Sequence, residues 1–379
     1  AVAFPLHSLF IQGFSCHPSP RSLLQDDPRD DEVLVSVTAC GICHTDVAVR
    51  EQHIPSPAPM VLGHEGVGVV ECVGDSVSYV KPGDHVLMSY ASCGTCTNCK
   101  AGSPSYCSSH RDLNFGGRRP DGSLTHTHAT KDSPVYGSFF RQSSFATHAL
   151  ATQRNVVKIP DTVSAPLESL APLGCGVQTG AGAVMNTLKV GAGSSIAVFG
   201  TGTVGLSAVM AAKVVGSATI VAVDTSPARL EVAASLGATH TVLSTPDGDP
   251  AEVPARIAET VSAAGGLDFA LDTTGVPAVL RTAIEALRAT GIAALVGGSP
   301  PGSQLSVDML TLLLGRGVRG IIQGDSISQE FLPYLMQLHE AGKFPFTEMI
   351  TYYDGLETIN SALDDTASGA CVKPVIRIA

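Results

Sequence analysis

Residues 194–205 have the sequence SSIAVFGTGTVG, in which an apolar run is followed by glycines spaced as G-x-G-x-x-G. The first glycine, Gly200, allows a tight turn, Gly202 lets a pyrophosphate approach the backbone, and Gly205 lets the next helix pack on the strand. A strand is predicted before the glycines and an Ala/Val-rich helix after them. The stretch therefore predicts a dinucleotide-binding turn, with an ordinary glycine-rich connection between strand and helix as the alternative.

The cofactor preference depends on the next apolar strand, ATIVAV, which ends at Asp224. A carboxylate here can bond both ribose hydroxyls and would repel a 2′-phosphate, so NAD is favoured over NADP. Thr203 and Val204 begin the helix after the glycines, where free N–H groups meet the phosphates. Arg229 follows by one helical turn and is predicted to contact the adenosine end, or else to form a surface ion pair. Its charge leaves some tolerance for NADP.

The pattern on either side of this turn predicts two domains of an α/β protein. Strands and helices alternate over residues 177–317, and the strands are continuous apolar runs, which predicts a doubly wound parallel sheet. Residues 1–176 contain short β-branched segments separated by turns, which predicts a β-rich, barrel-like domain. After residue 317 the pattern weakens into helices at 328–341 and 355–367 and a last strand. This tail is predicted to return to the first domain.

Composition excludes several classes of function. The chain of 379 residues is 44% hydrophobic and 15% charged, which is typical of a globular protein with two domains. Its net charge of −11 argues against a nucleic-acid partner, and no apolar run is long enough to span a membrane. The N-terminal AVAFPLHSLF lacks a basic segment followed by a long apolar core, so no secretory signal is expected. A cytoplasmic location is predicted.

Four cysteines form what we call the compact set, in CGTCTNC followed by YC: Cys93, Cys96, Cys99 and Cys107. Neighbouring cysteines here are too close to pair neatly as disulfides, whereas their rhythm suits the wrapping of a metal. Four thiolates fill a tetrahedral zinc shell, which is a closed, structural arrangement. Iron–sulfur ligation is the alternative by ligand type. The spacing predicts a zinc-stapled lobe at about residues 90–110.

Three further ligands form what we call the scattered set: Cys43 in CGICHTD, His64 in LGHEG and Cys175 in PLGCG. Three protein ligands leave the fourth zinc position for water or substrate, as in catalytic zinc sites. Asp46 is a candidate to fix the tautomer of His64. Glu65 is a candidate for an occasional extra ligand, or for a residue that tunes the electrostatics of the site. Taken singly, each cysteine is more often a small buried hydrophobe.

The motifs CGICHTD, GHEGVGVV, KPGDHV, CGTCTNC, PLGCG and VFGTGTVGL occur in this order. In these motifs the chain resembles the zinc-dependent medium-chain alcohol dehydrogenases, from about residue 30 to the C-terminus. NFGGRRPDG and SSFATHALA resemble most the aryl (benzyl) alcohol dehydrogenase branch. The resemblance implies a GroES-like catalytic domain (1–176 and 318–379) and a Rossmann domain (177–317). It also implies two zinc ions per chain (one catalytic, one structural), NAD(H), an alcohol or aldehyde substrate, and a homodimer or homotetramer.

The resemblance also implies roles for single residues. Cys43, His64 and Cys175 match the catalytic zinc ligands, and the compact set matches the structural zinc. Thr45 matches the hydroxyl that takes the alcohol proton, and Asp46 matches the carboxylate behind the zinc. The remaining matches are His44 facing the cofactor pyrophosphate, Thr179 and Val296, Gly297 and Gly298 near the nicotinamide, Lys373 on a cofactor phosphate, and Tyr90 in the substrate pocket. A core position is the alternative for Tyr90.

These roles predict the reversible oxidation of a primary alcohol, aromatic or allylic in type, to an aldehyde. The reaction is expected to pass through an alkoxide at the zinc, with hydride transfer to the nicotinamide. Many relatives pass the proton on to a histidine a few residues beyond the hydroxyl, but Val47 and Ala48 stand there. The proton is therefore expected to leave through ribose and His44, or through water. The alternatives are a glutathione-dependent formaldehyde dehydrogenase, a zinc-free reductase of quinones or enones, and a non-catalytic scaffold that binds zinc and NAD.

Overall fold

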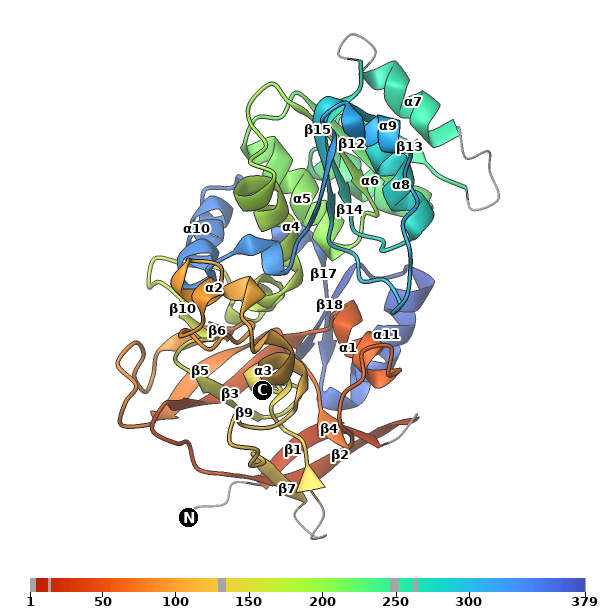
Figure 1. Ribbon diagram of the computed structural model, residues 1–379. Helices are drawn as coiled ribbons and strands as arrows, with labels where there is room; N and C mark the ends of the chain where they lie inside the picture. The colour runs from red at the N-terminus through yellow and green to blue at the C-terminus, as the bar shows by residue number, and fades with distance from the viewer. Residues whose placement is uncertain (1–4, 13–14, 129–133, 246–251, 262–264, 379) are drawn as a thin grey trace. The chain divides into compact units, whose positions relative to one another are not determined.

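A computed structural model describes residues 5–12, 15–128, 134–245, 252–261 and 265–378, which form two compact units (Figure 1). Unit 1 contains the described residues of Ala1–Cys175, Ile327–Glu340 and Thr347–Ala379. Unit 2 contains those of Gly176–Ser326 and Ala341–Phe346. The predicted α/β class, with one β-rich and one parallel-sheet part, is confirmed.

Unit 2 is built on a parallel sheet in the order β13-β12-β11-β14-β15-β16. These strands are β11 (Ser195–Phe199), β12 (Thr219–Asp224), β13 (His240–Leu243), β14 (Leu267–Asp272), β15 (Leu287–Leu295) and β16 (Gly317–Gly320). The strand order reverses direction beside β11, as in a Rossmann domain, where ligands bind at the carboxyl ends of the strands. The predicted doubly wound sheet is confirmed.

In unit 2, α4 (Gly176–Gly182) precedes β11, and the helices between the strands are α5 (Thr203–Val214), α6 (Pro227–Leu236), α7 (Glu252–Thr260), α8 (Pro277–Glu285) and α9 (Met309–Leu313). Local signals fix α6, since the Ser226 hydroxyl accepts the N–H of Arg229, Pro227 begins the helix and Gly237 ends it. The chain is α-helical from Gly176 to Gly182 and continues as a π-helical turn, Ala183–Thr187.

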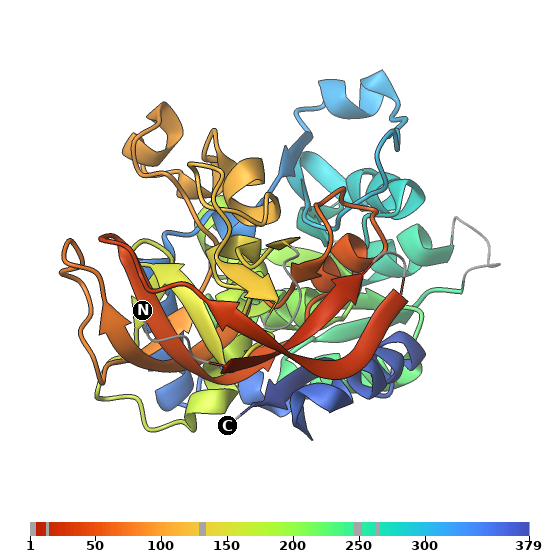
Figure 2. The same ribbon diagram turned by 90° about the horizontal axis from the view of Figure 1, so that it is seen from below.

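Unit 1 contains two largely antiparallel sheets. The larger consists of β10 (Val156–Lys158), β6 (His85–Met88), β5 (Gly66–Val73), β3 (Glu32–Gly41), β18 (Lys373–Arg377) and β17 (Ile350–Asp354), with β9 (His148–Thr152) also paired to β3. The smaller consists of β4 (Met60–Val61), β1 (Pro5–Gln12), β2 (Ser15–Gln25), β7 (His126–His128) and β8 (Pro134–Val135). The long pair β1 and β2 is prominent in Figure 2. It was not foreseen, because the prolines of SCHPSPRSLLQ obscure the strand pattern.

The helices of unit 1 are α1 (His44–Arg50), α2 (Thr97–Lys100), α3 (His110–Phe115), α10 (Ser328–Glu340) and α11 (Ile359–Ser368). The tail returns to this unit as predicted, since β18 pairs antiparallel with β3. The boundary differs in detail, because residues 318–326 and 341–346 group with unit 2. Part of the reason is that β16 pairs with β15 as the outermost strand of the parallel sheet.

Candidate metal centre

The scattered set comes together in unit 1 from three segments of the chain. Cys43 caps α1 directly after β3, His64 and Glu65 precede β5, and Cys175 follows the 3-10 helix Leu167–Gly174. One ligand atom of each of these four residues lies within 4.8 Å of the others. The structure thus gathers the predicted catalytic ligands, with Glu65 among them.

The donor set fits a zinc ion. The Sγ atoms of Cys43 and Cys175 are 4.0 Å apart, and Nε2 of His64 is buried without a hydrogen-bond partner among the described residues. A hydrogen bond from Cys175 lowers the pKa of the Cys43 thiol well below its usual value, so this site readily holds a thiolate. Two sulfurs and one imidazole are ligands that zinc prefers, and three protein ligands leave one position open.

Asp46 holds two of the ligands in place. Its Oδ1 lies 3.2 Å from Nδ1 of His64 and accepts the N–H of Gly63 at 3.1 Å, while its Oδ2 accepts the N–H of Cys43 at 3.0 Å. Burial opposes a charged imidazole, but Asp46 and Cys43 together raise the pKa of His64 well above its usual value. The carboxylate therefore directs Nδ1 toward itself and leaves Nε2 for a metal.

Glu65 is paired with a buried cation. The ammonium group of Lys373, on β18, contacts the Glu65 carboxylate and donates to the carbonyl of Ile42 at 2.8 Å. Burial raises the pKa of Glu65 to about 7, although Lys373 opposes this shift. The predicted contact of Lys373 with a cofactor phosphate is not supported by this placement. The ammonium group is only 1% exposed and is already bound to a carboxylate beside the metal ligands.

Thr45 and His44 lie beside the scattered set on α1. The hydroxyl of Thr45 is 3.7 Å from the sulfur of Cys43, and His44 is exposed. Two aromatic rings cover the ligand imidazole, since Phe140 stacks on His64 at 4.5 Å between centroids and Phe139 meets it edge-on at 5.3 Å. These rings shield the ligand from water.

The structure places Tyr90 in the core, which was the alternative to a position in the substrate pocket. It belongs to the apolar cluster that contains Phe139 and Phe140, and its hydroxyl accepts a hydrogen bond from Ser105 at 3.2 Å. Burial raises its pKa to about 12. The structure therefore favours a core role for Tyr90.

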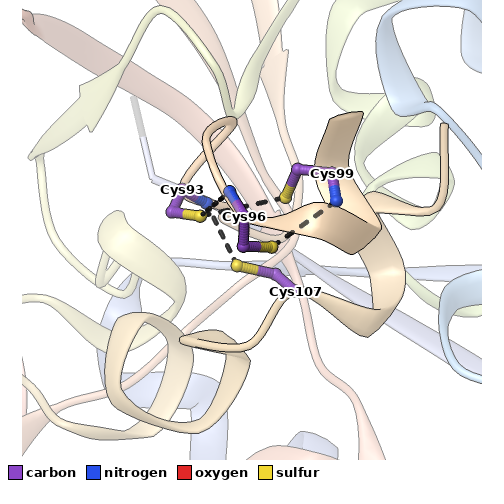
Figure 3. Close-up of side chains that lie close together, drawn as sticks. All are labelled: Cys93, Cys96, Cys99 and Cys107. Atoms are coloured by element: carbon purple, nitrogen blue, oxygen red, sulfur yellow. Dashed lines mark hydrogen bonds between the residues drawn. The ribbon is translucent and has the colours of Figure 1, made fainter. Parts of the chain in front are cut away.

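The compact set gathers on one lobe of unit 1 (Figure 3). The sulfurs of Cys93 and Cys99 are 4.0 Å apart, and backbone N–H groups point at three of the four sulfurs. The N–H groups of Ser108 and Cys99 lower the pKa of Cys96 to about 5. The pKa of Cys93 is also lowered, to about 7, whereas burial raises the pKa values of Cys99 and Cys107. Four sulfurs gathered in one lobe fit a closed zinc site. None of the nine described cysteines forms a disulfide, in agreement with the metal interpretation.

The glycine turn in unit 2 has the geometry that the sequence predicts. Gly200 has φ = 86°, and a Cβ on Gly205 would lie 1.9 Å from the carbonyl oxygen of Gly200. A Cβ on Gly202 would meet no described atom within 4 Å, so space for a ligand lies above this backbone. Thr203 and Val204 begin α5 after the cap Gly202. The turn fits a dinucleotide phosphate at a helix N-terminus.

Asp224 ends β12 beside this turn, but its carboxylate is already bonded. Its Oδ2 accepts the N–H and hydroxyl of Thr201 at 2.7 and 2.8 Å, and its Oδ1 accepts the N–H of Ser226 at 2.9 Å. Thr201 was missed by the sequence reasoning, although it lies inside GTGTVG. Arg229 lies on α6 with its Nε buried and without a partner among the described residues.

The other predicted cofactor contacts also lie in unit 2. Thr179 is a buried residue of α4. Val296 and Gly297 follow β15 and donate their N–H groups to the carbonyl of Asp272 at 2.9 and 3.2 Å, and Gly298 comes next. Val296–Gly298 thus follow the carboxyl end of a strand of the parallel sheet, where the fold binds its ligands.

Comparison with known proteins agrees with both units. Residues 29–161 match the family "Alcohol dehydrogenase GroES-like domain", and residues 203–340 match the family "Zinc-binding dehydrogenase". A geraniol dehydrogenase of Castellaniella defragrans is 44% identical, with 92% of this chain and 91% of that protein covered. A zinc-binding-domain alcohol dehydrogenase of Burkholderia ambifaria is 46% identical with a TM-score of 0.94, and all of both chains is covered. A benzyl alcohol dehydrogenase of Acinetobacter calcoaceticus is 41% identical with a TM-score of 0.92, with 99% of this chain and 100% of that one covered.

Proposed function

Because the chain belongs to the zinc-dependent medium-chain alcohol dehydrogenase family, we propose that it interconverts primary allylic or aromatic alcohols and their aldehydes with NAD(H). The enzyme class follows from the family. The substrate class is supported by the named activities of the relatives, geraniol and benzyl alcohol dehydrogenase. One observation carries the proposal: the side chains of Cys43, His64 and Cys175 meet within 4.8 Å, with Nε2 of His64 lacking a partner among the described residues.

In this proposal unit 1 performs the chemistry and unit 2 binds the cofactor. Zinc, when bound by the scattered set, supplies a Lewis acid that favours ionisation of an alcohol oxygen. The Thr45 hydroxyl lies beside the metal ligands, 3.7 Å from the Cys43 sulfur, and would accept the alcohol proton while passing on its own. The exposed His44 adjoins Thr45 and passes the proton to solvent, because Val47 and Ala48 offer no relay.

The cofactor half of the proposal places the pyrophosphate at Gly202, Thr203 and Val204. NAD supplies the hydride acceptor when bound. Asp224 favours the ribose of NAD and disfavours a 2′-phosphate, and two hydrogen bonds from Thr201 orient its carboxylate. Thr179 and Val296–Gly298 are proposed to line the nicotinamide end.

Two broader assignments complete the proposal. A homodimer or homotetramer is supported by exposed apolar side chains on α9, where Met309 and Leu313 are 83% and 80% exposed. A cytoplasmic location is supported by nine described cysteines without disulfides. No helix in the described ranges has both the length and the apolar character needed to cross a membrane.

The test is a substrate panel. Purified protein is assayed with geraniol, benzyl alcohol, ethanol and S-(hydroxymethyl)glutathione, each with NAD and NADP. We expect the highest kcat/KM for geraniol or benzyl alcohol with NAD. A higher kcat/KM for S-(hydroxymethyl)glutathione would establish the formaldehyde dehydrogenase alternative, and absence of turnover in a preparation with two zincs would favour the scaffold.

A further inference from the structure

Gln142 is a fully buried side chain that makes four hydrogen bonds beside the scattered set. Its Oε1 accepts from the N–H of Gly66 at 3.1 Å and from the hydroxyl of Ser144 at 2.8 Å. Its Nε2 donates to the carbonyls of His64 at 2.9 Å and Ser89 at 3.1 Å. A side-chain amide has two N–H donors and one oxygen that accepts two bonds, so Gln142 is saturated.

Two of these bonds bracket Glu65. The amide holds the carbonyl of the preceding residue, His64, and the N–H of the following residue, Gly66, much as a neighbouring strand would. The backbone on both sides of Glu65 is therefore fixed by one side chain. This determines the directions in which the side chains of His64 and Glu65 leave the backbone.

The fourth bond connects this segment to the one that carries Cys175. The hydroxyl of Ser89 donates to the carbonyl of Gly174 at 2.8 Å, and Gly174 directly precedes Cys175. The segments are in close contact, because a Cβ on Gly174 would lie 3.2 Å from the Cα of Glu65. Gln142 thus stands where the segments of His64 and Cys175 meet.

The backbone around Gln142 is held in an unusual conformation. Phe140, Arg141 and Ser143 have φ of 50°, 54° and 48°, in the left-handed region that side chains rarely adopt. The amide of Asn155 donates to the carbonyls of both Phe140 and Arg141 at 3.2 Å. Such strain persists only where surrounding contacts determine the backbone, and it is common at functional sites.

From these contacts we infer that Gln142 is a positioning residue of the catalytic zinc site, which sets the distance between the ligands His64 and Cys175. Its amide bonds three backbone groups and the Ser144 hydroxyl, and no metal-ligand side chain. The inference rests on the proposed function, because it takes the scattered set to be the catalytic zinc site. If Gln142 only satisfied buried backbone groups, its replacement would lower overall stability and would affect the two zinc sites equally.

The test compares two buried amides, each replaced by an apolar side chain of similar size. Gln142→Met removes all four bonds. The control is Asn114→Leu, because Asn114 is equally buried and clamps the N–H and carbonyl of Ala91, near the compact set. Zinc release to a chromophoric chelator is timed for each purified variant, and the visible spectrum of the Co²⁺-substituted protein reports ligand geometry.

We expect Gln142→Met to release one of two zincs about 10–100 times faster than the wild type and to shift the cobalt spectrum. Asn114→Leu should leave the release rate of the catalytic zinc unchanged. Gln142→Glu keeps the bonds from Gly66 and Ser144 but loses both donors, so it should behave like Gln142→Met. Equal zinc release by Gln142→Met and the wild type, or equal acceleration of both zincs, would overturn the inference.

A gentler variant covers the case in which Gln142→Met does not fold. Ser89→Ala removes the hydroxyl that donates to Gly174 and accepts from Ser328 at 3.2 Å, but keeps the Ser89 carbonyl that Gln142 binds. It should accelerate release of the same single zinc, and an unchanged rate would count against the inference. Failure of the proposed function is separate, since it would appear in the wild-type protein itself, as fewer than two zincs or as absence of turnover in the substrate panel.

Discussion

The compact and scattered sets illustrate two ways of building a metal site. The compact set takes four sulfurs from one lobe, and backbone N–H groups of that lobe point at them. The scattered set takes its ligands from three segments and is oriented by side chains such as Asp46, on the segment of Cys43, and Lys373, on β18. The first geometry is therefore local, whereas the second depends on the fold of unit 1.

The largest effect should follow loss of a scattered ligand. Cys43→Ala removes one sulfur from the catalytic set, so we expect one zinc per chain and turnover lower by about 1000-fold or more, since a Lewis acid supplies several kcal/mol. The compact set should keep its zinc. Metal analysis and steady-state kinetics on the same sample check this, and two retained zincs would contradict the ligand assignment.

A smaller loss is expected when a supporting side chain of the scattered set is changed. Asp46→Asn keeps the shape of the side chain but replaces one acceptor oxygen by an NH₂ group. Because three N–H groups point at the wild-type carboxylate, at least one of them would lose its acceptor. We expect zinc affinity or kcat to fall about 10–100-fold. The matched change in the compact set is Thr95→Val, because the Thr95 hydroxyl lies 3.5 Å from the Cys93 sulfur at an exposed position. This control should stay within about twofold, as expected for an exposed weak contact.

The two sets also differ in how far sequence could predict them. The C-x-x-C-x-x-C rhythm identified the compact set from spacing alone, because its ligands share one lobe. The scattered ligands were identified through their motifs and order, and the structure brings them together. The contacts of Lys373 with Glu65, of Gln142 with His64 and of Thr201 with Asp224 join residues whose proximity only the folded chain creates. The strand pair β1 and β2 escaped prediction for the same reason, since tertiary pairing overrides its prolines.

A ligand of the compact set should affect stability more than chemistry. Cys96→Ser removes one sulfur of a closed site, so we expect one zinc fewer and a Tm lower by roughly 5–10 °C, or about 2–3 kcal/mol. The catalytic zinc should remain, with kcat of the folded protein within about threefold. A kcat loss as large as that of Cys43→Ala would show that the two sets are not independent.

The smallest effect concerns thiol reactivity and leaves the wild-type sequence unchanged. In metal-free protein, N–H groups of Ser108 and Cys99 hold the pKa of Cys96 at about 5, whereas burial raises the pKa of Cys72, which is in neither set. Cys96 is thus mainly thiolate at pH 6, and its alkylation by iodoacetamide should fall only below about pH 5. Cys72 should react only at alkaline pH, and the buried Cys175 should stay protected. Peptide mass spectrometry across pH 4–9 measures all three. Equal reactivity of Cys96 and Cys72 at pH 6 would show that backbone N–H groups do not stabilise the Cys96 thiolate before a metal binds. The geometry of the compact set would then depend on the metal itself.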